Sequence, residues 1–132
     1  MTRTQIETPS APKPFGSYSQ GIRVGDTIHV AGQIPLSVET GQIVGQTVYE
    51  QTAQVLRNVR AILQAGGADF DDIVMLRAYL SGPEGFPELN EALEETFAAP
   101  YPARTTLYGV LPQGILVEID ALAITSDSKK TR

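Results

Sequence analysis

Residues 115–125 read ILVEIDALAIT, an apolar run interrupted by two carboxylates. The run predicts a β-strand, in which alternate side chains lie on opposite faces of a sheet. Residues 72–80, DIVMLRAYL, predict a second buried strand of the same character. Because both runs are apolar on both faces, the sheet that they build needs a cover on each side.

Two amphipathic helices can cover one face of that sheet. The first is predicted from about Thr47 to Ala65, with Thr47 as its cap and Gly66-Gly67 at its end. The second is predicted from about Pro87 to Ala98. Apolar residues recur at spacings of three and four in both, namely Val48, Val55, Leu56, Val59, Ile62 and Leu63 in the first and Phe86, Leu89, Leu93 and Phe97 in the second.

Shorter β-prone runs complete the sheet. Tyr18–Val24 and Thr27–Gly32 flank a two-residue turn at Gly25-Asp26, and a further strand begins at Arg104 and ends at Tyr108. The order β-β-(β)-α-β-α-β-β predicts one α+β domain over residues 1–132, with a mixed sheet of about six strands and both helices on one face. No second sheet layer is evident, so we expect other subunits to cover the opposite face.

The two ends of the chain are expected to lack regular structure. Prolines at positions 9, 12 and 14 predict that residues 1–16 form an extended arm. Residues 126–132 are expected to form a mobile tail. No segment resembles a signal peptide, and no run reaches the about 18 apolar residues that span a bilayer. We therefore expect a cytoplasmic protein without a membrane partner.

Composition and motifs argue against several classes of function. Ten Lys and Arg against 15 Asp and Glu give a net charge of −5, which disfavours a nucleic-acid partner. The absence of cysteine excludes disulfides and thiolate sites, and the only histidine, His29, has no partner motif, so we expect a strand histidine and no metal site. The segment FGSYSQG is not G-x-S-x-G, and no glycine-rich phosphate motif occurs. The acidic cluster Asp69, Asp71 and Asp72 lacks calcium-loop spacing and predicts a capped, solvated turn.

Two charged features lie where charge is costly. Glu118 and Asp120 project to the same face of the predicted strand, about 7 Å apart. Repulsion and burial together should make the two carboxyls raise each other's pKa, so Glu118 is a candidate general acid or base. Arg104 begins the preceding strand, and if these two strands pair as a hairpin, its guanidinium meets Glu118 in one pocket. The pair could be a partly buried salt bridge or an anion-binding arginine beside a water-activating glutamate, and the residues leave both readings open.

Several segments together resemble the RidA family, also called the YjgF or translation-inhibitor-type endoribonuclease family. They are GSYSQGIRVGDTIHVAGQIP, FPELNEALEETF and PYPARTTLYGVLPQGILVEIDALAI, and the resemblance extends over residues 5–125. It implies a chorismate-mutase-like fold and a homotrimer with a central barrel of sheets and sites between subunits. The implied reaction hydrolyses 2-aminoacrylate and related enamines or imines, without cofactor, to 2-keto acids and ammonia, which protects pyridoxal-phosphate enzymes.

The resemblance also implies roles for individual residues. Arg104 corresponds to the carboxylate-binding arginine, and Glu118 corresponds to the water-activating glutamate. Tyr18, Asn90 and Gly32, the last as a backbone donor, correspond to the remaining site residues. Each of these three also fits a plain structural role: a core aromatic, a polar residue on a helix surface and a glycine at a strand end.

Three departures from the family pattern bear on substrate preference. Thr106 replaces a frequent cysteine two residues after the arginine, and Ala31 replaces a frequent serine before the glycine. The loop between Arg104 and Leu111 is one residue shorter than in well-known members. The alternative to a deaminase is a non-catalytic trimer that binds small carboxylates as a sensor or chaperone-like module, and an endoribonuclease is disfavoured by the negative charge and the unpaired histidine.

Overall fold

The computed structural model describes residues 2–125, so the predicted tail at 126–132 lies outside the described residues. Two helices and six strands alternate along the chain, which confirms the predicted α+β class. The strands are β1 (Thr4–Ile6), β2 (Gly21–Val24), β3 (Thr27–Gln33), β4 (Ile73–Leu80), β5 (Ala103–Tyr108) and β6 (Val117–Ile124). The helices are α1 (Val48–Ala65) and α2 (Phe86–Thr96).

The strands form one mixed sheet in the order β1-β2-β3-β6-β4-β5. All neighbours are antiparallel except β4 and β5, which are parallel. The hairpin of β5 and β6, which the sequence analysis considered as a condition for a shared pocket, does not form, because β4 lies between them. The reason is the connection through α2: a strand, a helix and a following strand form a crossover that places the two strands parallel and adjacent.

The N-terminal segment contains a strand that the sequence analysis missed. Thr4–Ile6 pairs with β2, so the expectation that residues 1–16 lack regular structure is wrong at this point. The proline-rich stretch after β1 is held by the buried amide of Gln20. Its Oε1 accepts from the Thr8 N–H at 2.8 Å, and its Nε2 donates to the carbonyls of Thr8, Ala11 and Pro12 at 2.9–3.1 Å. One side chain thus replaces the ladder hydrogen bonds that prolines cannot make.

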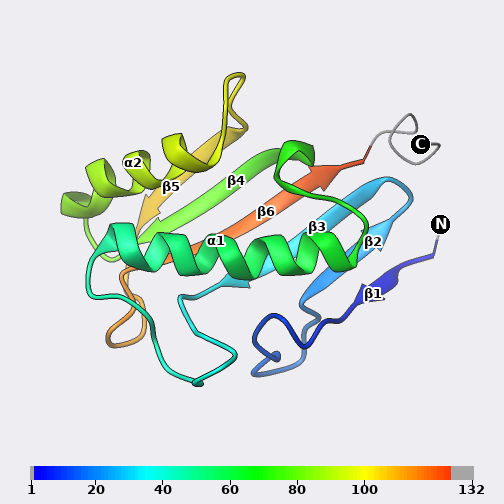
Figure 1. The fold of residues 1–132 in the computed structure, drawn as a ribbon, viewed down its shortest axis with the longest axis horizontal. Helices are drawn as coiled ribbons and strands as arrows, with labels where there is room; N and C mark the ends of the chain where they lie inside the picture. Colours follow the sequence, from blue (N-terminus) through cyan, green and yellow to red (C-terminus); the bar gives the residue numbers. More distant parts are fainter. Residues whose placement is uncertain (1, 126–132) are drawn as a thin grey trace.

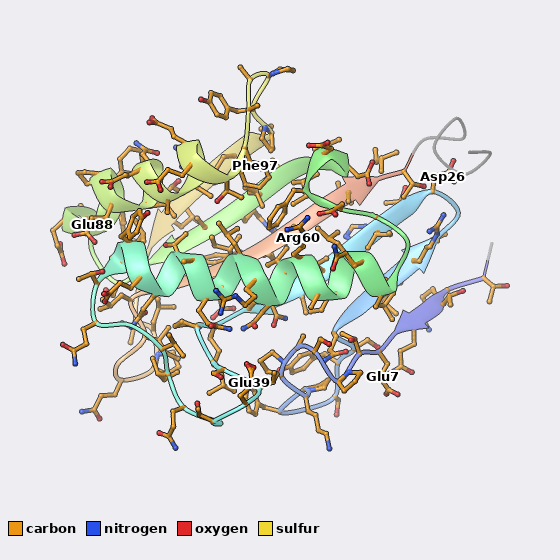
Figure 2. All side chains as sticks on the ribbon, viewed as in Figure 1. Glu7, Asp26, Glu39, Arg60, Glu88 and Phe97 are labelled. Atoms are coloured by element: carbon orange, nitrogen blue, oxygen red, sulfur yellow. The ribbon has the colours of Figure 1, made fainter. Side chains whose placement is uncertain are left out.

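Both helices cover the same face of the sheet, as predicted (Figure 1). α1 begins after Thr47, whose side chain accepts from the Glu50 N–H at 3.1 Å, and it ends at Gly66. Its apolar stripe packs on β6 and β3. Arg60 of α1 and Phe97, which follows α2, lie over the same part of the sheet (Figure 2). Phe70 contacts both of them: its ring centroid is 5.2 Å from Cζ of Arg60 and 5.3 Å from the ring centroid of Phe97.

The opposite face of the sheet carries half-buried and exposed side chains. Along β6, Leu122 and Ile124 alternate with the buried Ala121 and Ala123, and Ile124 is 49% exposed. Because both helices lie on the other side (Figure 1), neither of them covers this face. We call it the open face.

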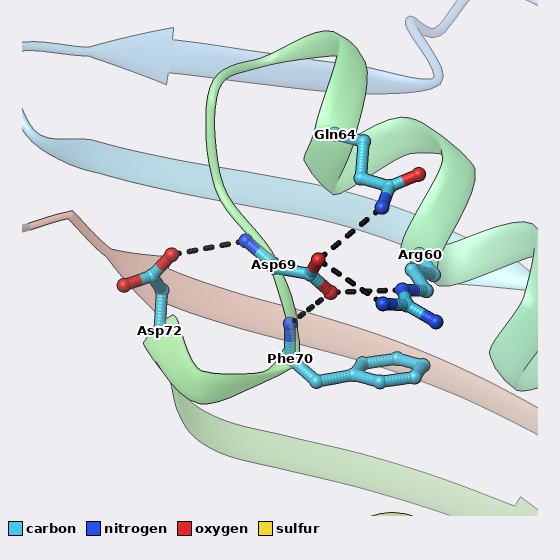
Figure 3. Close-up of polar contacts among 5 residues, drawn as sticks. All are labelled: Arg60, Gln64, Asp69, Phe70 and Asp72. Atoms are coloured by element: carbon cyan, nitrogen blue, oxygen red, sulfur yellow. Dashed lines mark hydrogen bonds and ion pairs between the residues drawn. The ribbon is translucent and has the colours of Figure 1, made fainter. Parts of the chain in front are cut away.

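The acidic turn before β4 is a capped turn, as predicted. Asp69 caps a short 3₁₀ helix, Phe70–Asp72, and accepts from the Phe70 N–H at 2.7 Å (Figure 3). Asp72 accepts in return from the Asp69 N–H at 2.9 Å, which completes a capping box. Arg60 and Gln64 of α1 also donate to the Asp69 carboxylate, so the turn is tied to the helix.

Asp69→Ala is expected to lower the free energy of unfolding by about 1 kcal/mol at pH 7, the usual cost of a lost cap. Burial alone raises the pKa of Asp69, but hydrogen bonds from Arg60, the Phe70 amide and Gln64 outweigh it, so the pKa lies below its ordinary 3.8. A lowered folded-state pKa stabilises the fold above the unfolded-state value, and this contribution disappears as the pH falls through the folded value. Urea titrations should therefore show a lower free energy of unfolding for Asp69→Ala than for wild type, and this difference should shrink below about pH 4.

Asp69→Asn serves as the matched control for this prediction, because its amide oxygen can still cap the turn but carries no charge. Its deficit at pH 7 is expected to be smaller than that of Asp69→Ala. A deficit for either variant that stays the same from pH 7 to below about pH 4 contradicts a role for the ionised carboxylate.

Candidate functional site

The predicted site residues fall into two groups on opposite faces of the sheet. Arg104 lies opposite the buried Leu76 in the parallel β4–β5 register, so its side chain points to the helix face. There its guanidinium donates to Oδ1 of Asn90 at 2.6 Å and stacks 5.5 Å over the ring of Phe86. Thr106, opposite Ala78, is half-buried and projects to the same face as Arg104.

The arginine opens onto a cavity of about 310 Å³ between α2 and β5. Its polar lining residues are Asn90, Glu94 and Arg104, and its other lining residues are Leu76, Leu93, Phe97, Tyr101 and Pro102. A cation fixed beside an apolar cavity suits a small ligand with a carboxylate and an apolar part.

Glu118 lies on the open face, on the other side of the sheet from Arg104. It is opposite Tyr79 in the β4–β6 register, and its neighbour along this face is Asp120, as the sequence predicts. Burial raises the pKa of Glu118 above its ordinary value, and the charge of Asp120 adds to the effect. The Asp120 carboxylate accepts two hydrogen bonds, from Nε of Arg77 at 3.0 Å and from the Tyr79 hydroxyl at 3.3 Å. The predicted direction of the Glu118 pKa shift is confirmed.

Gly32 lies directly against the Glu118 carboxylate. The register of β3 and β6 shifts between Val30 and Gln33, so Gly32 lies in an irregular stretch of β3. A Cβ atom at Gly32 would overlap the Glu118 carboxylate, so only glycine leaves that carboxylate in place. Tyr18, whose side chain is 48% exposed, lines the same surface hollow as Gly32.

Within one chain, Arg104 and Glu118 do not form a salt bridge. Among residues 2–125 the ion pairs are Arg23–Asp26, Arg60–Asp69 and Arg77–Asp120. Arg104 and Glu118 are separated by β4 and face opposite sides of the sheet. Within one chain, the predicted site residues therefore form two separate groups. Arg104 contacts Asn90 on the helix face. Gly32 lies against Glu118 on the other face and shares a surface hollow with Tyr18.

Sequence reasoning missed Phe86 as a partner of Arg104. The spacing of apolar residues predicts only that Phe86 lies on the apolar face of the second helix, and it gives no sign of the contact with the guanidinium. The signal lies in the topology, because α2 connects β4 to β5 and so passes over the strand that carries Arg104. Across residues 2–125, no three His, Asp or Glu side chains are grouped so that they could hold a metal ion. In the same range, neither helix is long and apolar enough to cross a membrane.

Comparisons with known proteins agree on one family. The model of the family described as Endoribonuclease L-PSP matches residues 8–125. The chain is 44% identical to a RutC family protein of Pyrococcus abyssi, covering 93% of this chain and 98% of the relative. It is 37% identical to the 2-iminobutanoate/2-iminopropanoate deaminase of Homo sapiens, covering 94% and 91%. The crystal structure of E. coli TdcF with bound serine is similar with a TM-score of 0.87 at 34% identity, covering 93% and 99%.

Proposed function

The chain belongs to the endoribonuclease L-PSP family, which includes the RidA proteins, and we propose that it hydrolyses 2-imino acids to 2-keto acids and ammonia at a site between two copies of the chain. The human relative is named for this reaction on 2-iminobutanoate and 2-iminopropanoate. The TdcF structure holds serine, a small amino acid with a carboxylate like that of the proposed substrate.

One observation carries the proposal: a carboxyl with a raised pKa and a fixed arginine lie on opposite faces of one sheet. A general base works best when its pKa approaches the working pH, and the shift of Glu118 is in that direction. Arginine can hold a carboxylate through two parallel hydrogen bonds. Because β4 separates the two side chains, both can reach one ligand only if they come from different copies.

A homotrimer provides such a meeting point. The open face of the sheet has apolar residues that the two helices leave uncovered, and the family resemblance implies that three such faces form a central barrel. In that arrangement the Arg104 edge of one copy would lie against the Glu118 group of the next. Each of the three interfaces would then hold one complete site.

The proposed mechanism assigns one step to each group. Arg104 holds the substrate carboxylate, Asn90 and Phe86 keep the guanidinium in place, and a backbone N–H near Gly32 helps orient the ligand. As the bond between water oxygen and C2 forms, Glu118 accepts a proton from the water. It passes this proton to the imine nitrogen, so that C2 carries a hydroxyl and an amino group. Glu118 then accepts the hydroxyl proton as the C2=O bond forms and gives it to the nitrogen as the C2–N bond breaks, which releases ammonia and the 2-keto acid.

A coupled assay tests the proposal. A serine or threonine dehydratase generates the imine, semicarbazide traps the free imine, and the 2-keto acid is followed over time. The purified chain is expected to increase 2-keto acid formation in competition with the trap. If it binds 2-keto acids but leaves their formation unchanged, the non-catalytic binding module is correct and the deaminase is not.

The rate should depend on pH through Glu118. A general base must be ionised, so kcat/KM is expected to fall as the pH drops through the raised pKa of Glu118. Asp120→Asn removes the neighbouring negative charge, which lowers the pKa of Glu118, although burial still raises it. The acid limb of the kcat/KM profile should therefore move to lower pH. Asp71→Asn, in the distant acidic turn, is the control, and an unmoved limb for Asp120→Asn contradicts the assignment of Glu118 as the base.

A further inference from the structure

We propose that the cavity between α2 and β5 receives the side chain of the substrate, so that the chain prefers 2-imino acids with a branched aliphatic side chain to 2-iminopropanoate. This inference rests on the proposed function, because it takes Arg104 as the group that holds the substrate carboxylate. The cavity would select the imine, while Arg104 and Glu118 act on the part that all 2-imino acids share.

The arrangement of the lining matches such a ligand. Arg104 and Asn90 form a polar end, joined by their 2.6 Å hydrogen bond, and Leu76, Leu93 and Phe97 form apolar walls. In a 2-imino acid, C2 carries both the carboxylate and the side chain. A carboxylate held on Arg104 therefore directs the side chain toward these walls or away from them, and within this chain the walls offer the apolar contact.

The walls are held in place by the surrounding fold. Leu76 and Leu93 are buried in the core. The ring of Phe97 meets Phe70 edge-on, with centroids 5.3 Å apart and planes at 62°. Phe70 is in turn covered by Arg60, which is tied to the capped turn at Asp69 (Figures 2 and 3). The cavity thus has the preformed character of a small-molecule site.

The size of the cavity argues for more than a methyl group. Its volume of about 310 Å³ reaches the lower end of the range for small-ligand sites, about 300–1,000 Å³. In a fitted apolar pocket, one methylene changes discrimination by about tenfold or more. A branched four-carbon side chain, as in the imine derived from leucine, should therefore gain at least about tenfold over a methyl group.

Glu94 adds a charge filter. Its side chain lies on the exposed side of α2 and lines the cavity together with Arg104. A ligand with a carboxylate in its side chain would place that charge near Glu94, and like charges repel. We therefore expect imines derived from aspartate or glutamate to be poor ligands.

The experiment measures binding of stable 2-oxo acids by calorimetry, which needs no catalysis. Wild type is expected to bind 4-methyl-2-oxopentanoate at least about tenfold more tightly than pyruvate. Leu93→Phe, which fills the cavity, should weaken binding of 4-methyl-2-oxopentanoate more than binding of pyruvate and so remove that preference. Because a larger core residue can disturb folding, Glu94→Gln provides a second variant: it should improve binding of 2-oxoglutarate, while Glu91→Gln, exposed on the same helix and outside the lining, should not.

The outcomes separate this inference from the proposed function. Equal affinities for 4-methyl-2-oxopentanoate and pyruvate in wild type overturn the inference, whatever the dehydratase assay shows. An unchanged preference in a folded Leu93→Phe variant, or equal effects of Glu94→Gln and Glu91→Gln, also overturns it. A clear preference with no acceleration of imine hydrolysis supports the cavity as a side-chain site and rejects the deaminase.

Discussion

Glu118→Gln is expected to lower kcat/KM for 2-imino acid hydrolysis by about 10²–10⁴-fold, the usual contribution of a positioned general base. Glutamine has nearly the same shape as glutamate but cannot accept a proton from water. The coupled dehydratase assay measures the loss at a pH above the raised pKa of Glu118. Activity within a few-fold of wild type would show that another group acts as the base.

The same substitution should make the fold more stable, which separates a catalytic role from a structural one. The pKa of Glu118 is raised in the folded state, first by burial and then by Asp120. A carboxyl with a raised folded-state pKa contributes most stability below its unfolded-state pKa, and this is lost as the pH rises through the folded value. The uncharged glutamine avoids that loss, so urea unfolding at pH 7 should show higher stability for Glu118→Gln. The two proteins should converge below about pH 4.

Gly32→Ala serves as the positional control for Glu118. Gly32 has no left-handed backbone conformation that would require glycine, so alanine is costly there only because its Cβ would overlap the Glu118 carboxylate. That carboxylate is the end of a flexible side chain and can move, so the variant should fold. It should nevertheless lose activity, because the base is displaced while its charge remains. Full activity in folded Gly32→Ala would contradict the placement of the carboxylate.

The parts of the fold with strong local patterns could be predicted from sequence. The helix from Thr47 to Ala65 has a capping residue, a helical period and a terminal glycine, and it is observed at Val48–Ala65. The three-residue strand Thr4–Ile6 was missed because it is too short for a period and depends on pairing with β2. Local pattern identifies elements well, but pairing decides where short ones form.

For the candidate site, too, local pattern identifies the residues but does not predict how they lie relative to one another. Arg104 and Glu118 stand out in sequence because charge is costly in apolar strands, and the raised pKa of Glu118 follows from burial in such a strand together with its neighbour Asp120. Their relative position did not follow, because it depends on β4 lying between β5 and β6. The contact of Gly32 with Glu118 occurs at a register shift in β3 for which the sequence offers no signal. Topology, which involves residues far apart in the chain, is what local pattern leaves out.

Arg104→Lys is expected to lower kcat/KM by roughly tenfold to a hundredfold, because an ammonium group cannot replace the paired hydrogen bonds of a guanidinium to a carboxylate. Lysine keeps the positive charge, so the loss would report geometry and not charge alone. The substitution also removes the hydrogen bond to Asn90 and the stacking on Phe86, which hold the side chain in place. Full activity in Arg104→Lys would show that Arg104 does not bind the substrate carboxylate.

Mixed oligomers of Arg104→Lys and Glu118→Gln chains test whether one site uses two copies. In a ring of three that contains both variants, one interface joins an intact Arg104 from one chain to an intact Glu118 from the other. Oligomers purified through two different tags should therefore recover about one third of wild-type activity, far above either variant alone. If each site were built within one chain, every chain would carry a defect and the mixture would stay as low as its components. Because Arg104 and Glu118 lie on opposite faces of the sheet within one chain, we expect the mixed oligomers to recover activity.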